Sequence, residues 1–182
     1  MMDSQAYDIG EVVIAGATGF IGTRLGEQLG DRVELIGLSR SHRAPPTGYR
    51  ECRSVDLFSR ADSIRALQGA QIAIYLVHSM IPSARLVQAT FQDLDLLCAD
   101  NFGRAAAANG VKHIIYVSGL IPQDEELSDH LHSRLEVERA LSAHGVPTIT
   151  LRAGMVVGAK GSSFQMLARL VKRLPVMLCP EW

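Results

Sequence analysis

Two histidines and an arginine lie within five residues of one another, at His130, His132 and Arg134, in the segment DHLHSRLEVERAL (129–141). The segment has the apolar spacing of a helix, in which residues four apart share a face. His130 and Arg134 therefore share a face and could act as a proton donor and a fixed positive charge. His132 is only two residues from His130, and a helical metal pair needs a spacing of four. We assign no metal site.

The composition restricts the class of protein to which these residues can belong and the partners that it can have. The chain has 182 residues, 47% hydrophobic and 20% charged, which is typical of one soluble domain. A formal net charge of -1 gives no reason to expect nucleic acid or an anionic membrane as partner. The cysteines, at 52, 98 and 179, have no metal spacing and fit a reducing compartment. With no signal peptide and no bilayer-spanning apolar run, we expect a cytoplasmic protein without a membrane partner.

Short apolar segments alternate with longer amphipathic ones. Strands are predicted at 11–16, 32–38, 49–55, 70–77, 112–119 and 147–153, and helices at 18–30, 59–69, 85–110 and 129–141. Glycines at 30, 69, 110 and 145 follow helices, where a left-handed cap is easiest. Strands buried on both faces and separated by helices predict an α/β fold with a parallel, doubly wound sheet in three αβα layers. Ligands of such a sheet bind at the carboxyl ends of its strands.

The first predicted strand continues into GATGFIG, with glycines at 16, 19 and 22. Gly16 would allow a tight turn, Gly19 would let the backbone approach a pyrophosphate, and Gly22 would let the helix pack closely on the sheet. The phosphates would lie at the helix N-terminus, where N–H groups and the dipole favour negative charge. A glycine-rich turn without a ligand is the alternative. We favour a dinucleotide site.

The end of the second strand selects the nucleotide. An acidic residue there would bind the ribose of NAD, whereas an arginine accommodates the additional phosphate of NADP. Here the strand ends in GLSR, with Ser39, Arg40 and, further on, Arg43, and no carboxylate. We therefore expect NADP rather than NAD, although Arg40 could instead be a solvated surface residue. Asp56, in SVDL, is placed either to meet the adenine edge or to cap the following helix.

GATGFIG, the later VDL and YVSGL (116–120) resemble the extended and atypical branches of the short-chain dehydrogenase/reductase superfamily. YLVHSM (75–80), LSDHLHSRLEVE (127–138) and SFQMLARLVKRLPVM (163–177) are similar to bacterial NmrA-like, NAD(P)-binding SDR family oxidoreductase proteins. In many of those a Rossmann domain precedes a separate C-terminal domain. The resemblance implies that residues 1–182 are a single NAD(P)-binding Rossmann domain and the N-terminal part of a longer protein.

The resemblance also implies which residues bind the cofactor: Gly16, Thr18, Gly19, Phe20, Ile21, Gly22, Arg40, Asp56 and Leu57, with Val77, His78 and Ser79 near the nicotinamide ribose. A loop histidine bonded by backbone is the alternative for His78.

Typical members of the superfamily use a serine at the end of the fifth strand and a Tyr-x-x-x-Lys motif on the next helix. Ser118 stands at the serine position, and His130 and Arg134 are the best-aligned pair on the helix. His130 could donate a proton, and Arg134 could hold a ribose but cannot relay a proton. A solvated histidine is the alternative for His130. Tyr116 lies inside a strand and would point into the packing of the sheet.

The usual Arg-Pro-Gly after the sixth strand is replaced by Arg152-Ala153-Gly154, and we expect Arg152 to be a buried structural arginine rather than a substrate contact. Two functions remain. The first is an NADP-dependent oxidoreductase acting on a small carbonyl or hydroxyl substrate through a substituted Tyr-Lys motif. The second is a non-catalytic NADP-binding sensor, regulatory or assembly module of the NmrA type. The expected partners are a dinucleotide and a small molecule, with either a homodimer mate or a C-terminal domain of a parent protein.

Overall fold

The structure, a computed structural model, describes residues 9–41, 44–77, 91–122, 127–158 and 161–173. Residues 1–152 and 153–182 form two compact units. The first contains β1 (Glu11–Ala15), α1 (Phe20–Leu29), β2 (Glu34–Ser39), β3 (Glu51–Ser54), α2 (Arg60–Ala66), β4 (Ala70–Tyr75), α3 (Phe91–Ala108), β5 (His113–Gly119), α4 (Asp129–Ser142) and most of β6 (Thr148–Ala153). The second contains α5 (Ser162–Arg173), an amphipathic helix. That residues 1–182 are one domain and the N-terminal part of a longer protein stays a prediction.

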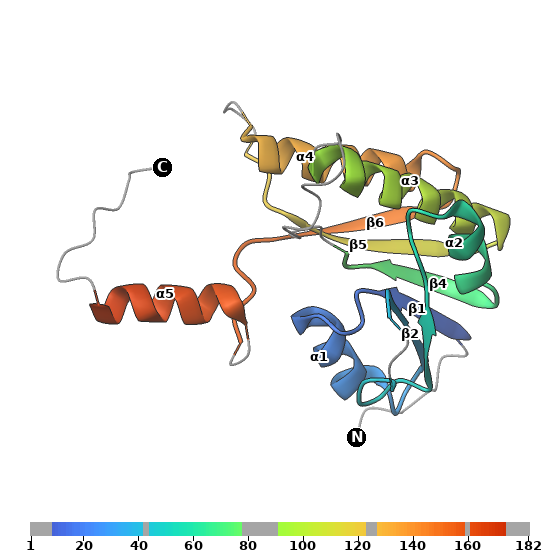
Figure 1. The fold of residues 1–182 in the computed structure, drawn as a ribbon, viewed down its shortest axis with the longest axis horizontal. Helices are drawn as coiled ribbons and strands as arrows, with labels where there is room; N and C mark the ends of the chain where they lie inside the picture. The colour runs from blue at the N-terminus through green and yellow to red at the C-terminus, as the bar shows by residue number, and fades with distance from the viewer. Residues whose placement is uncertain (1–8, 42–43, 78–90, 123–126, 159–160, 174–182) are drawn as a thin grey trace, which may run out of the picture. The chain divides into compact units, whose positions relative to one another are not determined.

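The described strands form one six-stranded sheet in the order β3-β2-β1-β4-β5-β6. The pairs β1–β2, β1–β4, β2–β3 and β4–β5 are parallel. This order reverses direction between β1 and β4, which is the point at which doubly wound sheets bind ligands. Helices α2, α3 and α4 lie along one face of the sheet and α1 lies along the other (Figure 1). The predicted doubly wound Rossmann fold is confirmed.

Burial on both faces of the sheet follows from the alternation of side chains along each strand. In β1, Val13 and Ala15 join the cluster that includes residues of α2, α3 and α4. Val12 and Ile14 join the other cluster, against which Leu25 of α1 packs. An almost uninterrupted apolar run is therefore needed in the central strands. The edge strand β6 departs from this expectation, because Ile149 and Leu151 are about half exposed.

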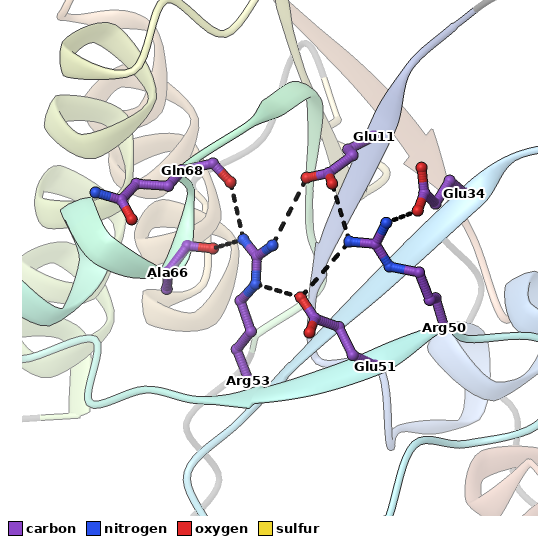
Figure 2. Close-up of polar contacts among 7 residues, drawn as sticks. All are labelled: Glu11, Glu34, Arg50, Glu51, Arg53, Ala66 and Gln68. Carbon is purple, nitrogen blue, oxygen red and sulfur yellow. Dashed lines mark hydrogen bonds and ion pairs between the residues drawn. The ribbon is translucent and has the colours of Figure 1, made fainter.

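A network of charges connects the amino ends of the first three strands (Figure 2). Arg50 pairs with Glu34 and, at 2.9 Å, with Oε1 of Glu11. Arg53 pairs with Glu51 at 2.7 Å and lies 3.6 Å from Oε2 of Glu11. Its Nη1 also donates to the carbonyls of Ala66 and Gln68, both at 2.9 Å. The network therefore fastens the edge strand β3 to both the sheet and the end of α2.

Three of the four predicted glycine caps have the expected backbone. Gly69, Gly110 and Gly145 have φ of +82°, +67° and +80°. The prediction for Gly30 was wrong, because its φ is -58° and its ψ is -27°. A Cβ on Gly30 would lie 2.5 Å from both Cα and O of Gly48, so this position needs a glycine for space and not for a left-handed turn.

None of the helices in the described part of the chain combines the length and the apolar character that crossing a bilayer requires.

Candidate functional site

The candidate site lies where β1 and β4 end side by side at the switch point of the sheet. The N–H of Leu76, just after β4, donates to the carbonyl of Ala15 at 2.9 Å. Gly16 follows immediately with φ of +91°, and a Cβ there would lie 3.1 Å from the backbone of Leu76. The chain can therefore leave β1 and turn beside β4 only because this residue has no side chain.

The remaining glycines of the loop fit the roles expected of them. Gly22 is buried, and a Cβ on it would lie 2.4 Å from the carbonyl oxygen of Gly16 and 2.6 Å from Cα of Ala17. Because these are backbone atoms, the close approach of α1 to the end of β1 requires glycine. Gly19 is exposed and its N–H donates to the carbonyl of Gly16 at 3.0 Å. Backbone is thus presented to solvent at the start of α1.

The N-terminus of α1 has no side-chain cap. Gly19 is its N-cap residue, and its first turn contains no acidic residue. By contrast, Ser59 caps α2 through the N–H of Asp62, and Ser128 caps α4 through the N–H of Leu131. The first N–H groups of α1 and its dipole can therefore serve an anion. Of the predicted contacts here, Thr18 is exposed, whereas Phe20 and Ile21 are half-buried.

The ends of β2 and β3 lie together beside this loop. Ser39 pairs with Ser54, and the N–H of Val55 donates to the carbonyl of Ser39 at 2.9 Å. Ser39 is half-buried, and Arg40 and Asp56 are exposed. The structure thus brings these predicted residues to one corner of the sheet. Arg43 lies outside the described residues.

Asp56 does not cap α2, because Ser59 does. That alternative was wrong. Instead, Oδ1 of Asp56 accepts the N–H of Phe58 at 3.0 Å, which closes a tight turn. Leu57, next to it, is buried in the core.

The charges of this corner act on a buried thiol in α3. Burial raises the pKa of Cys98 to about 12, and Asp95 and Asp56 act in the same direction. The positive charge of Arg40 acts in the opposite direction. Cys98 is therefore a neutral, packed thiol at physiological pH.

Of the three residues predicted after β4, only Val77 lies in the described part of the chain. It is half-buried and packs against the core cluster that includes residues of α2, α3 and α4. His78 and Ser79 lie outside the described residues.

Ser118 lies near the end of β5 and is 5% exposed. Tyr116, two residues earlier, is on the same face and is 1% exposed, as expected for a strand residue that points into the packing. Burial raises the pKa of Tyr116, and the Arg134 charge and the Ser118 hydroxyl beside it act in the opposite direction. Among the described residues, neither hydroxyl has a partner with hydrogen-bond geometry. Such buried hydroxyls call for water or another polar group.

Helix α4 holds His130 and Arg134 in different environments. His130, in the first turn, is exposed. Arg134 is 7% exposed, and its Nη2 lies 3.1 Å from Oδ2 of Asp95 in α3. Asp95 is itself buried, at 4% exposed. The guanidinium therefore makes a buried ion pair between the two helices.

Arg152 is not buried, contrary to expectation. Its side chain is 44% exposed, and Nη2 lies 3.2 Å and 3.3 Å from the two carboxylate oxygens of Glu138. Because β6 is the edge strand, Arg152 lies at the surface, where its ion pair connects β6 to α4.

Two polar residues of α3 were missed by the sequence analysis. Asp95 holds Arg134, and Asn101 donates to the carbonyls of Leu57 and Phe58. Their signal was a polar residue within the apolar stripe of the helix, which includes the buried Cys98, Phe102 and Ala105.

Comparison with known proteins assigns the fold to a family. The profile of the NAD dependent epimerase/dehydratase family matches residues 12–177. Auxiliary protein GraX of Staphylococcus aureus is 34% identical over 142 residues, which cover 77% of this chain and 43% of that protein. The chain thus spans less than half the length of this curated relative.

Solved structures of similar fold include two enzymes. UDP-N-acetylglucosamine 4-epimerase from Bacillus cereus is 22% identical with a TM-score of 0.68, over 88% of this chain and 61% of that chain. NADPH-dependent quinone oxidoreductase QOR2 of Escherichia coli, in complex with NADPH, is 26% identical with a TM-score of 0.62, over 79% of this chain and 48% of that chain. Because the family profile covers most of the sequence, the chain belongs to the NAD dependent epimerase/dehydratase family, within the short-chain dehydrogenase/reductase superfamily.

Proposed function

We propose that the protein binds NADP(H) at the carboxyl ends of β1 and β2 and reduces a small carbonyl compound, with quinones as the favoured class. The observation that carries the proposal is the uncapped N-terminus of α1, which lies beside a β2 end that bears Arg40 and no carboxylate. Backbone N–H groups suit the pyrophosphate, and the exposed guanidinium suits the additional phosphate of NADP.

The residues present fit a dinucleotide. In the loop from Gly16 to Gly22, the glycine at 22 lets α1 begin close to the end of β1, and the exposed Gly19 leaves backbone open to a phosphate. Thr18, Gly19, Phe20 and Ile21 would hold the pyrophosphate. Ser39, Arg40 and Arg43 would hold the phosphate of the adenosine ribose, and Asp56 and the backbone of Leu57 would face the adenine. Val77, His78 and Ser79 would lie by the nicotinamide ribose. When bound, NADPH supplies the hydride.

Quinones are favoured as substrates because the sequence lacks the Tyr-x-x-x-Lys motif. Reduction of a simple ketone produces a strongly basic alkoxide, which a Tyr-Lys pair normally protonates. A quinone accepts hydride to give the anion of a hydroquinone, a much weaker base that needs only a modest acid. The exposed His130 could supply that proton, and Ser118 could orient the substrate oxygen. The similarity to a quinone oxidoreductase supports this choice.

The cofactor part is tested by titrating NADPH and NADH into the wild-type protein and into Arg40→Ala. We expect Arg40→Ala to weaken NADPH binding by about 10- to 100-fold, the range for a lost charge-assisted hydrogen bond, and NADH binding far less. Arg32→Ala is the matched control, since Arg32 is exposed and precedes β2 at the opposite end of the strand. Equal losses for both dinucleotides in Arg40→Ala would refute the phosphate contact.

The chemical part is tested by NADPH oxidation with a panel of quinones and aldehydes. We expect turnover with quinones, and a fall in kcat of about 100-fold or more in His130→Ala if this histidine is the acid. His132→Ala, another exposed histidine of the same helix, should leave kcat within about twofold of wild type. Unchanged kcat in His130→Ala would refute its role as the acid.

A second function is favoured by one observation. Arg134, aligned with the lysine of the usual Tyr-x-x-x-Lys motif, is engaged with Asp95 inside the protein. This supports a non-catalytic NADP-binding module, used as a sensor or a regulatory part of a larger assembly. Such a role is in keeping with the name of GraX as an auxiliary protein. Tight NADPH binding without turnover on any substrate of the panel would select it.

A further inference from the structure

The side chain of Asn101 in α3 is fastened to the segment that follows β3. Its Nδ2 donates to the carbonyl of Leu57 at 2.9 Å and to the carbonyl of Phe58 at 3.0 Å. Asn101 is 6% exposed, so the bond to Leu57 is buried, and the bond to Phe58 is partly buried. Both donors of the amide are thereby used on two consecutive carbonyls, more than 40 residues away in the sequence.

The same segment is fixed from its other side. Asp56 accepts the N–H of Phe58 with its carboxylate at 3.0 Å, and its carbonyl accepts the N–H of Ser59 at 3.0 Å. Leu57 is 8% exposed and anchored in the core, whereas Asp56 is exposed. Asn101 therefore determines the path of a turn whose outward side is a carboxylate next to the end of β2.

We propose that Asn101 is a positioning residue for the adenine half of the dinucleotide. It holds the 56–58 turn in the conformation that receives the adenine edge. This inference rests on the proposed function, because the turn has a ligand only if a dinucleotide binds. Without the amide, the two carbonyls lose buried donors and the turn must be ordered again on each binding event, which weakens binding.

A purely structural role for Asn101 predicts a different pattern of effects, and the asparagine that directly follows α3 offers the comparison. Asn109 donates to the carbonyls of Ile64 and Ala105, at 2.9 Å and 2.8 Å. It makes the same kind of bond to α2 from the residue that follows α3, but it fastens no residue expected to contact nucleotide. Both asparagines should contribute to the free energy of unfolding, and only Asn101 should contribute to nucleotide affinity.

The experiment compares Asn101→Ala, the milder Asn101→Ser and the control Asn109→Ala. Affinities for NADPH, NADH and 2′,5′-ADP are measured by fluorescence and calorimetry. Hydrogen exchange of the Phe58 and Ser59 amides is followed without ligand. For Asn101→Ala we expect affinity to fall about five- to tenfold for all three ligands, from the loss of two hydrogen bonds. The ratio of NADPH to NADH affinity should stay constant, unlike in Arg40→Ala. Exchange of the Phe58 amide should accelerate in the Asn101 variants only.

The outcomes separate this inference from the proposed function. If the wild-type protein binds none of these ligands, the proposed function fails and this inference fails with it. If wild type binds and the Asn101 variants bind equally well, or if Asn109→Ala loses as much affinity, this inference alone is overturned. If neither Asn101 variant folds, hydrogen exchange of the Phe58 amide in the wild-type protein, with and without ligand, tests the inference instead. 2′,5′-ADP must slow exchange at Phe58, and unchanged exchange overturns the inference.

Discussion

Replacing Asp95 by Asn tests the interior ion pair between α3 and α4. The side chains of Arg134 and Asp95 are 8% and 6% exposed, and the substitution keeps the shape of the carboxylate while removing its charge. The guanidinium is then left buried opposite a neutral amide. Removing one partner of a buried pair costs about 3–5 kcal/mol in the free energy of unfolding, a large share of the roughly 5–15 kcal/mol of a typical domain. We therefore expect a loss of at least about 3 kcal/mol.

The assay is urea denaturation followed by circular dichroism, with two companion variants. The double replacement Asp95→Leu with Arg134→Met removes both charges and should recover most of the lost stability. Glu27→Gln breaks the surface pair with Arg24, whose side chains are 29% and 50% exposed, and should cost less than about 0.5 kcal/mol.

Two results would refute this reasoning. If Asp95→Asn loses less than about 1 kcal/mol while NADPH affinity collapses, Arg134 serves the nucleotide and not the helix pair. Equal stability of the single and the double variants would also contradict it, since removing one charge of the buried pair would then cost no more than removing both.

Two further predictions concern packing and pH. Gly22→Ala should cost about 1–3 kcal/mol and weaken NADPH binding, because its Cβ would strike backbone atoms. Gly110→Ala, with φ of +67° and nothing within 4 Å, should cost about 1–2 kcal/mol in backbone strain and leave binding unchanged; equal binding defects would contradict this. The Cys98 thiol, with its pKa raised to about 12, stays protonated in the fold while the unfolded thiol ionises from about pH 8.5. The contribution of this raised pKa to the free energy of unfolding is therefore full below about pH 8.5 and is lost progressively toward pH 12. Urea midpoints of wild type at pH 7, 9 and 10 should decline more steeply than those of Cys98→Ala, and parallel declines would count against the assignment.

Local signals in the sequence were sufficient for the sheet and the glycine loop. The spacing of Gly16, Gly19 and Gly22 describes a turn in which Gly22 packs against the backbone of Gly16 and Ala17, and the structure has φ of +91° at Gly16 as a tight turn requires. Gly30 could not be interpreted in the same way. Gly30 must be glycine because the backbone of Gly48 packs against it, and Gly48 follows β2 in the chain.

The candidate site was less predictable because its partners lie far apart in the sequence. Helical spacing places Arg134 on a face, but it does not reveal that Asp95, 39 residues earlier, lies opposite. Arg152 was expected to be buried, because the sequence of a strand does not reveal whether that strand lies at the edge of the sheet. In both cases the missing information is which elements are neighbours.

The charge network at the amino ends of the strands has a consequence for how related sequences can diverge. Arg53 bonds to the backbone carbonyls of Ala66 and Gln68, which any residue supplies, so drift at those two positions leaves its bonds intact. Glu11 is different, because it lies against both Arg50 and Arg53 through its side chain. Substitutions at Glu11 should therefore occur together with changes at the two arginines. This end of the sheet can be redesigned as a group without altering the opposite end, where the glycine loop lies.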